Sequence, residues 1–252
     1  MSDLNWSVVV TTAPRKKPKL KTTVQSLKAA GWNNPIVFAE PESPTCDAKT
    51  YTSENKLGVF HNWMRAARHA LDSNADVIMM VQDDVWFSPD SKWFAESALW
   101  PENCGFLSLY TPLHYSIVQG KMKPWGIYPI YTKSLWGAMA MIWHPKVLSR
   151  VVNSWRATEP WIGRRKTMSY EEKQHKTENP ETICNVDTFI GYCVKDMKRE
   201  MYYVNPSFAQ HISEYSSIGG RDAKGKRSAK FMVGMRDVPT AKEIPVNSHI
   251  FS

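Results

Sequence analysis

Residues 76–84 read Asp76-Val-Ile-Met-Met-Val81-Gln82-Asp83-Asp84, an unbroken apolar run that ends in two adjacent carboxylates. An apolar run without alternating polar residues is typical of a strand that is covered on both faces, as in a parallel sheet. Ligands of open α/β sheets bind at the carboxyl ends of the strands. The stretch therefore predicts a buried central strand with a binding crevice at Asp83 and Asp84.

Strands and helices alternate around this run in the first half of the chain. A β-branched segment over residues 7–12 is followed by apolar residues at helical spacing over 20–27, with Gly31 where that helix would end. A second apolar strand over residues 35–39 is followed by the strongest helical pattern, over 57–71. The alternation predicts an α/β fold with a central, mostly parallel sheet.

The second half of the chain is expected to be richer in loops. Strands are predicted over residues 105–110 and 137–143, and an apolar stripe that extends to Trp155 predicts a helix after the second of them. Residues 164–180 are polar and charged, which predicts a long loop. No internal repeat is found, so we expect a single domain with a loop-rich C-terminal part.

The composition excludes several classes of protein. Of the 252 residues, 42% are hydrophobic and 22% charged, which excludes a disordered chain. No apolar run reaches the roughly 18 residues that span a bilayer, and no signal-peptide core is found, so we expect a cytoplasmic protein without a membrane span. The four cysteines lack paired spacing, which fits a reducing compartment. The net charge of +8 indicates an acidic ligand.

The paired carboxylates Asp83 and Asp84 favour a divalent cation. Mn²⁺ and Mg²⁺ prefer oxygen ligands and can bridge the oxygens of a diphosphate. The alternative is a simple turn after the strand, because Asp is common in turns.

A second polar segment, Gln210-His211-Ile-Ser-Glu-Tyr-Ser216-Ser217-Ile-Gly219-Gly220, could complete such a site. His211 is a possible metal ligand, and the hydroxyls of Ser216 and Ser217 with the glycine backbone suit phosphate. The alternatives are a structural histidine and an ordinary loop.

Asp187 is the third candidate. In a helix that begins near Ile183, Asp187 shares an apolar face with Ile190 and Val194. A buried carboxylate needs a partner or takes up a proton, which suits a general base. The alternative is that Asp187 caps the N-terminus of a helix that begins at Thr188.

The loop after the first strand is the fourth candidate. Thr11, Thr12, Ala13 and Arg15 offer hydroxyls, accessible backbone and a guanidinium, which suit the base, ribose and phosphates of a nucleotide.

Taken in order, these segments resemble the GT-A-fold glycosyltransferases, which use a nucleotide-sugar donor. Gln82-Asp83-Asp84 is similar to the acidic metal motif of that superfamily. The segment from Gln210 to Gly219 resembles the Gln-His…Ser-Ser…Gly signature of N-acetylglucosaminyltransferase IV-like enzymes and their bacterial and phage relatives. Residues 185–191, Asn-Val-Asp-Thr-Phe-Ile-Gly, resemble their catalytic-acid segment.

The resemblance implies a role for each segment. Asp187 would be the base of an inverting transfer, Asp84 and His211 would hold Mn²⁺ or Mg²⁺, and Trp136 with Gly137 would lie at the acceptor. The residues assigned to a nucleotide sugar, expected to be a UDP-sugar, are Thr11, Thr12, Ala13, Arg15, Gln82, Asp83, Ser216 and Ser217. Residues 1–110 would form the nucleotide-sugar half, 111–220 the acceptor and catalytic half, and 221–252 a basic tail.

Gln82 departs from the motif, since the resembled enzymes have an acid there. Side chains alternate along a strand, so we expect residues 82 and 84 to point to one side and residue 83 to the other. This assigns Asp84 to the metal and Asp83 to the ribose. With one carboxylate fewer, we expect either a metal affinity that is weak until the diphosphate binds, or an enzyme that depends less on metal than the enzymes it resembles.

Two rival functions remain. A nucleotidyltransferase would need a glycine-rich loop after the first strand, and residues 11–15 contain no glycine. A non-catalytic module that binds nucleic acid or carbohydrate would leave the three aspartates and His211 without a role. Trp125, Trp136 and Trp161 are candidate stacking surfaces, although tryptophans more often pack in the core.

The acceptor is the most open question. Basic residues make up five of the eight residues 14–21 and five of the ten residues 221–230. Such clusters are usually solvated surface, but they exceed what one diphosphate requires. DNA with a hydroxylated base, as in phage DNA modification, is therefore a hypothesis beside a glycan acceptor.

Overall fold

We describe the fold from a computed structural model, which defines residues 4–98, 100–118, 121–130, 135, 137–158 and 186–212. Eight strands of this part of the chain form one sheet in the order β3-β2-β1-β4-β10-β6-β11-β9. They are β1 (Trp6–Thr12), β2 (Ile36–Ala39), β3 (Lys49–Thr52), β4 (Val77–Gln82), β6 (Cys104–Ser108), β9 (Gly126–Pro129), β10 (Ala140–Trp143) and β11 (Glu200–Asn205). Only β9 and β10 run against the other strands of this sheet, so the predicted mostly parallel sheet is confirmed.

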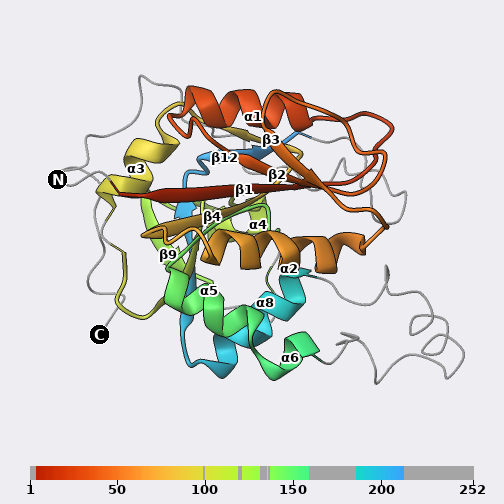
Figure 1. Ribbon diagram of the computed structural model, residues 1–252. Helices are drawn as coiled ribbons and strands as arrows, with labels where there is room; N and C mark the ends of the chain where they lie inside the picture. Colours follow the sequence, from red (N-terminus) through yellow and green to blue (C-terminus); the bar gives the residue numbers. More distant parts are fainter. Residues whose placement is uncertain are drawn as a thin grey trace, which may run out of the picture.

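Helices cover both faces of the sheet, which gives three layers (Figure 1). One face carries α1 (Leu20–Ala29) and α3 (Ser91–Ser97), and the other carries α2 (Gly58–Leu71), α5 (Pro145–Val152) and α8 (Val186–Asp196). The alternation of β1 supplies both cores, because Val8 and Val10 pack with the α1 side chains while Val9 packs with those of α2. Short helices α4 (Leu113–Ser116) and α6 (Trp155–Thr158) complete the helices described.

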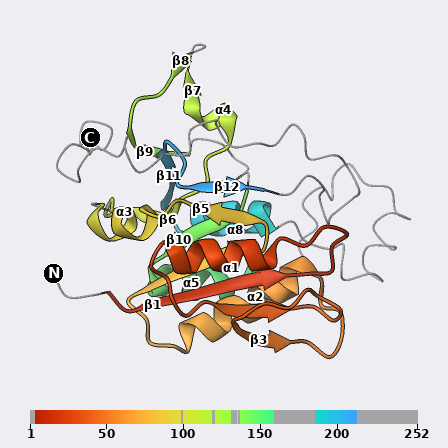
Figure 2. The ribbon, with the colours of Figure 1, turned by 90° about the horizontal axis from the view of Figure 1, so that it is seen from above.

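Two small sheets lie beside the large one. Strand β5 (Val85–Phe87), directly after the turn that follows β4, pairs antiparallel with β12 (Ala209–His211). Figure 2 shows β12 beside β5, although more than a hundred residues separate them in the sequence. Strands β7 (Ile117–Val118) and β8 (Lys121–Met122) form a hairpin.

The second half of the chain departs from the sequence prediction in two ways. The helix with the apolar stripe, α5, ends at Val152, and Asn153 is its C-cap. Trp155 instead begins the next helix, α6, and 59% of its surface is exposed. The predicted continuation to Trp155 was therefore wrong. The described strands β7, β8, β9, β11 and β12 were not predicted, although the buried run from Met201 to Val204 is rich in strand formers.

The chain order places a topological switch point between β1 and β4. After β1 the chain crosses to β2 and β3 on one side, and it then returns through α2 to β4 on the other side of β1. The two loops that leave β1 and β4 therefore diverge, and they leave a crevice between the carboxyl ends of these strands.

Candidate functional site

The crevice brings together the loop after β1 and the turn after β4. Thr11 pairs with Gln82 at the end of the two strands, and the Asp83 N–H donates to the carbonyl of Thr11 at 3.1 Å. One pocket is lined by all six donor-binding candidates of these two segments, namely Thr11, Thr12, Ala13, Arg15, Gln82 and Asp83. The sequence had predicted that these segments meet.

Asp83 is fully buried and is held by donors from the end of β1 and from the loop that follows it. The Thr12 hydroxyl donates to Asp83 Oδ2 at 2.5 Å, and Arg15 Nη2 lies 2.6 Å from Asp83 Oδ1. Burial raises the pKa of Asp83 to about 6, although the charge of Arg15 and the hydrogen bond from Thr12 act in the opposite direction.

Asp84 is also buried, and it joins Arg15 to His211. Its Oδ2 lies 2.7 Å from Arg15 Nη1 and 2.9 Å from His211 Nε2. Burial alone would raise the pKa of Asp84, but the hydrogen bond with His211 and the charge of Arg15 outweigh it, so this pKa is lowered. Asp84 and His211, which were predicted to hold a metal together, are in direct contact in the structure. This contact depends on the pairing of β12 with β5.

The expected alternation of residues 82, 83 and 84 was wrong. Strand β4 ends at Gln82, and residues 83 and 84 form a turn. Alternation applies only within a strand, so both carboxylates can face the guanidinium of Arg15. The turn interpretation and the cation-site interpretation of the Asp pair are therefore compatible.

A divalent cation fits this donor set as a half-site. Asp84 and His211 converge, and the buried Asp84 Oδ1 accepts no hydrogen bond from the described residues. However, no group of three His, Cys, Asp or Glu side chains suited to a metal is found in the part of the chain that the structure describes. A cation would need oxygens of a bound diphosphate to complete its shell.

Two polar side chains of the crevice, Glu40 and Asn62, were not predicted from the sequence. Glu40 follows β2 directly, as the Asp pair follows β4, so the rule of strand carboxyl ends could have found it. Asn62 lies on the buried face of α2 and donates to the carbonyls of Phe38 and Thr12. One side-chain oxygen of each residue is buried without a hydrogen bond from the described residues.

Asp187 lies in the first turn of α8 and is half-buried. Its two carboxylate oxygens accept hydrogen bonds from the backbone N–H groups of Gly137 at 2.8 Å and Ala138 at 2.9 Å. The helix already includes Val186, so the alternative that Asp187 caps a helix beginning at Thr188 was wrong. The predicted buried acid has partners, and they are backbone amides of the segment before β10.

The hydroxyl of Tyr110 is close enough to both Asp84 and Asp187 to feel the charge of each. Burial raises the pKa of the Tyr110 hydroxyl above its usual value, and the charges of Asp84 and Asp187 raise it further. Gly137 packs on the same ring, because a Cβ at Gly137 would lie 2.7 Å from Tyr110 Cε1, and its φ is +86°. The three aspartates thus belong to one region of the protein.

Several predicted residues lie outside the described part of the chain. They are Trp136, Trp161, Ser216, Ser217 and the basic cluster 221–230. Trp125 is described, and it is partly buried and meets Phe208 edge to face. Its contact with Phe208 agrees with a packing role.

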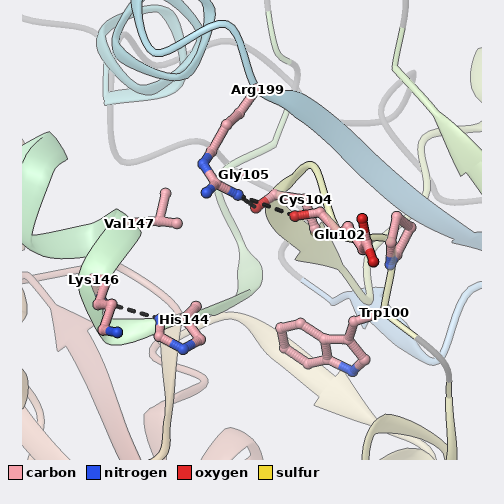
Figure 3. Close-up of a pocket in the computed structure, with 9 residues that line it drawn as sticks. Trp100, Glu102, Cys104, Gly105, His144, Lys146, Val147 and Arg199 are labelled. Atoms are coloured by element: carbon pink, nitrogen blue, oxygen red, sulfur yellow. Dashed lines mark hydrogen bonds between the residues drawn. The ribbon is translucent and has the colours of Figure 1, made fainter.

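A separate cavity of about 320 Å³ lies at the opposite end of the strands, where β6 begins and β10 ends (Figure 3). Its lining includes Trp100, His144 and Arg199. Arg199 donates to the carbonyls of Glu102 and Cys104, and His144 Nδ1 accepts the N–H of Lys146 at the start of α5. These side chains already stabilise local structure, and the cavity shares no residue with the crevice at the Asp pair.

Comparison with solved structures defines the class of fold. The structure of GalNAc-T7 with UDP, GalNAc and Mn²⁺ superposes with a TM-score of 0.53 at 10% sequence identity, over 87% of this chain and 45% of that chain. TarS of S. aureus in complex with UDP matches 79% of this chain and 60% of that chain, with a TM-score of 0.46 at 12% identity. At such identities the likeness to GalNAc-T7 shows the fold alone, and this fold is of the GT-A type.

The chain spans less than half of the GalNAc-T7 structure. The sequence matches no protein-family model and no curated protein. Within the described residues, no helix is both long and apolar enough to cross a bilayer.

The bond from Thr12 to Asp83 gives a test of how the crevice is held together. Thr12→Val keeps the shape of the side chain but leaves a buried carboxylate short of one donor, so we expect a loss of about 1–3 kcal/mol in the free energy of unfolding. Urea denaturation measures this loss. Thr11→Val is the matched control, because the Thr11 hydroxyl donates only at 3.3 Å to a backbone carbonyl. Equal losses in the two variants would contradict the role of Thr12.

Proposed function

We propose that this protein is a glycosyltransferase that moves a sugar from a nucleotide-diphosphate sugar, a UDP-sugar, to a hydroxyl of an acceptor. One observation carries the proposal: the Asp83-Asp84 pair lies at the switch point between β1 and β4, with His211 brought to Asp84. Ligands of open α/β sheets bind at this position. The GalNAc-T7 structure, which has the same type of fold, contains UDP, GalNAc and Mn²⁺, and this supports the choice of donor.

The nucleotide occupies the crevice between the two loops. Thr11, Thr12 and Ala13 line it on one side and Gln82 and Asp83 on the other, so these residues are assigned to the nucleotide. Asp84 and His211 would hold Mn²⁺ or Mg²⁺, which when bound neutralises negative charge on the diphosphate. Ser216 and Ser217 are assigned to the donor from the sequence resemblance alone.

Asp187 is the general base of the transfer. The acceptor oxygen attacks the anomeric carbon, the bond from that carbon to the diphosphate breaks, and the acceptor proton passes to Asp187 with inversion of the centre. The hydrogen bonds from Gly137 and Ala138 fix the position of the carboxylate. Each carboxylate oxygen keeps a second lone pair that can take the proton. Trp136 and Gly137 are assigned to the acceptor.

Hydrolysis of UDP-sugars with and without Mn²⁺ tests this function, since transferases commonly pass their donor sugar slowly to water. We expect UDP release that falls at least tenfold in Asp84→Asn, and transfer to an acceptor that falls by about 10²–10⁴ in Asp187→Asn.

Asp196→Asn is the matched control on the same helix, because Asp196 is exposed and pairs with Arg156. Activity that survives in both site variants would refute the mechanism. Binding of a sugar or nucleotide without any turnover would instead favour a non-catalytic binding protein.

The acceptor that we favour is a hydroxylated base in DNA rather than a glycan. Lys16, Lys17 and Lys21 are exposed on the segment that leads from the crevice into α1. Phosphate contacts by lysine release counterions, which makes binding to DNA fall steeply with salt. The modified base would have to leave the stack to reach Asp187.

A salt titration from about 50 to 200 mM with duplex and single-stranded DNA tests the acceptor. We expect a steep loss of affinity with salt, and a weaker salt dependence when Lys16, Lys17 and Lys21 are changed to Ala. Changing the exposed Lys195 and Lys198 to Ala gives a control at the far end of α8. Absence of binding at the lowest salt would exclude DNA and leave the glycan.

A further inference from the structure

Arg15 lies between the two carboxylates of the Asp pair. Its guanidinium contacts Asp83 Oδ1 at 2.6 Å and Asp84 Oδ2 at 2.7 Å, and only 11% of its side chain is exposed. Burial alone would lower the pKa of Arg15, but the two carboxylates outweigh it, so this pKa is raised and the charge is permanent. The negative charge of the Asp pair is therefore partly compensated by a residue of the chain itself.

We propose that Arg15 is a built-in counter-ion that excludes a divalent cation from Asp84 until the diphosphate of the donor draws the guanidinium away. The proposal deepens the proposed function, and it rests on that function only for the nature of the donor. Arg15 acts here as a positioning residue that sets the order in which donor and cation bind.

Arg15 and a cation would compete because both would use the same oxygen of Asp84. Asp84 Oδ2 already faces both Arg15 and His211, so a cation held by Asp84 and His211 would lie next to the guanidinium. Two positive charges at that distance in a buried site repel strongly, because little water is present to screen them. Departure of Arg15 would free Asp84 Oδ2 on one side, and the buried Asp84 Oδ1, which no described donor reaches, is a second acceptor of the same carboxylate.

The crevice supplies the group that can release Arg15. Arg15 lines the same pocket as Thr11, Thr12 and Ala13, so an anion that enters this pocket meets the guanidinium. Arginine binds phosphate oxygens through paired hydrogen bonds as readily as it binds carboxylates. A bound diphosphate can therefore take over the guanidinium of Arg15 from the two carboxylates. Asp84 and His211 are then free to bind the cation.

Binding of Mn²⁺ in the absence of nucleotide tests the exclusion directly. The electron paramagnetic resonance signal of free Mn²⁺ reports the bound fraction and needs no enzymatic turnover. We expect Arg15→Gln to bind Mn²⁺ at least tenfold more tightly than the wild type, and Arg15→Gln combined with Asp84→Asn to lose this gain. Equal affinities in wild type and Arg15→Gln would overturn the proposal.

Arg65→Gln is the control for charge, because Arg65 donates to the carbonyls of Ala39 and Tyr51 and contacts neither aspartate. It should leave Mn²⁺ affinity within twofold of wild type. If Arg15→Gln is unstable, its melting temperature carries the test, since Mn²⁺ should raise the Tm of this variant by several degrees more than that of the wild type. Equal Tm shifts would also overturn the proposal.

A titration with UDP separates this inference from the proposed function. UDP should tighten Mn²⁺ binding by the wild type more than by Arg15→Gln, because only the wild type has Arg15 to displace. If the wild type does not bind UDP but Arg15→Gln still binds Mn²⁺ tenfold more tightly, the proposed UDP-sugar donor is refuted. The proposal that Arg15 excludes the cation is then retained. Equal tightening by UDP in both proteins would refute the exchange of Arg15 while leaving the donor intact.

Discussion

The site depends on the compensation of two adjacent buried carboxylates. An ionised carboxylate that is buried without a partner is prohibitively costly, so Asp83 and Asp84 can exist in this position only with donors around them. Those donors come from distant parts of the chain: Thr12 and Arg15 from the end of β1 and the loop that follows it, and His211 from β12. The ion cluster therefore joins the first strand of the protein to the last strand described, and it arranges the crevice as it does so.

The sequence predicted the frame of this arrangement well. The unbroken apolar run before Asp83 identified the central strand β4, because a strand with five buried side chains in succession must be covered on both faces. The rule that ligands bind at strand carboxyl ends then placed the crevice between the segments of Thr11 and Gln82. These predictions used local pattern and general topology, which a single sequence contains.

Contacts that depend on tertiary pairing could not be predicted in the same way. His211 reaches Asp84 through the pairing of two three-residue strands, which are too short to leave a periodic signal. The orientation of Asp83 and Asp84 depended on where β4 ends, and strand ends are the least certain part of a sequence prediction. The role of Arg15 was also hidden, since a basic residue after a strand has the same local pattern whether it faces a phosphate or a carboxylate.

The antiparallel direction of β10 explains how Asp187 joins the site. Ala140, at the start of β10, pairs with Val81 near the end of β4. The segment before β10 therefore lies at the same end of the sheet as the crevice. The Gln82 N–H donates to the carbonyl of Met139 at 2.9 Å, which fixes this segment beside the acidic turn. The amides of Gly137 and Ala138 then hold Asp187 of α8. A parallel β10 would have placed this segment at the opposite end of the strands, beside the cavity near His144. The amides that hold Asp187 near Tyr110 would then have been missing from the end of the sheet that carries the crevice.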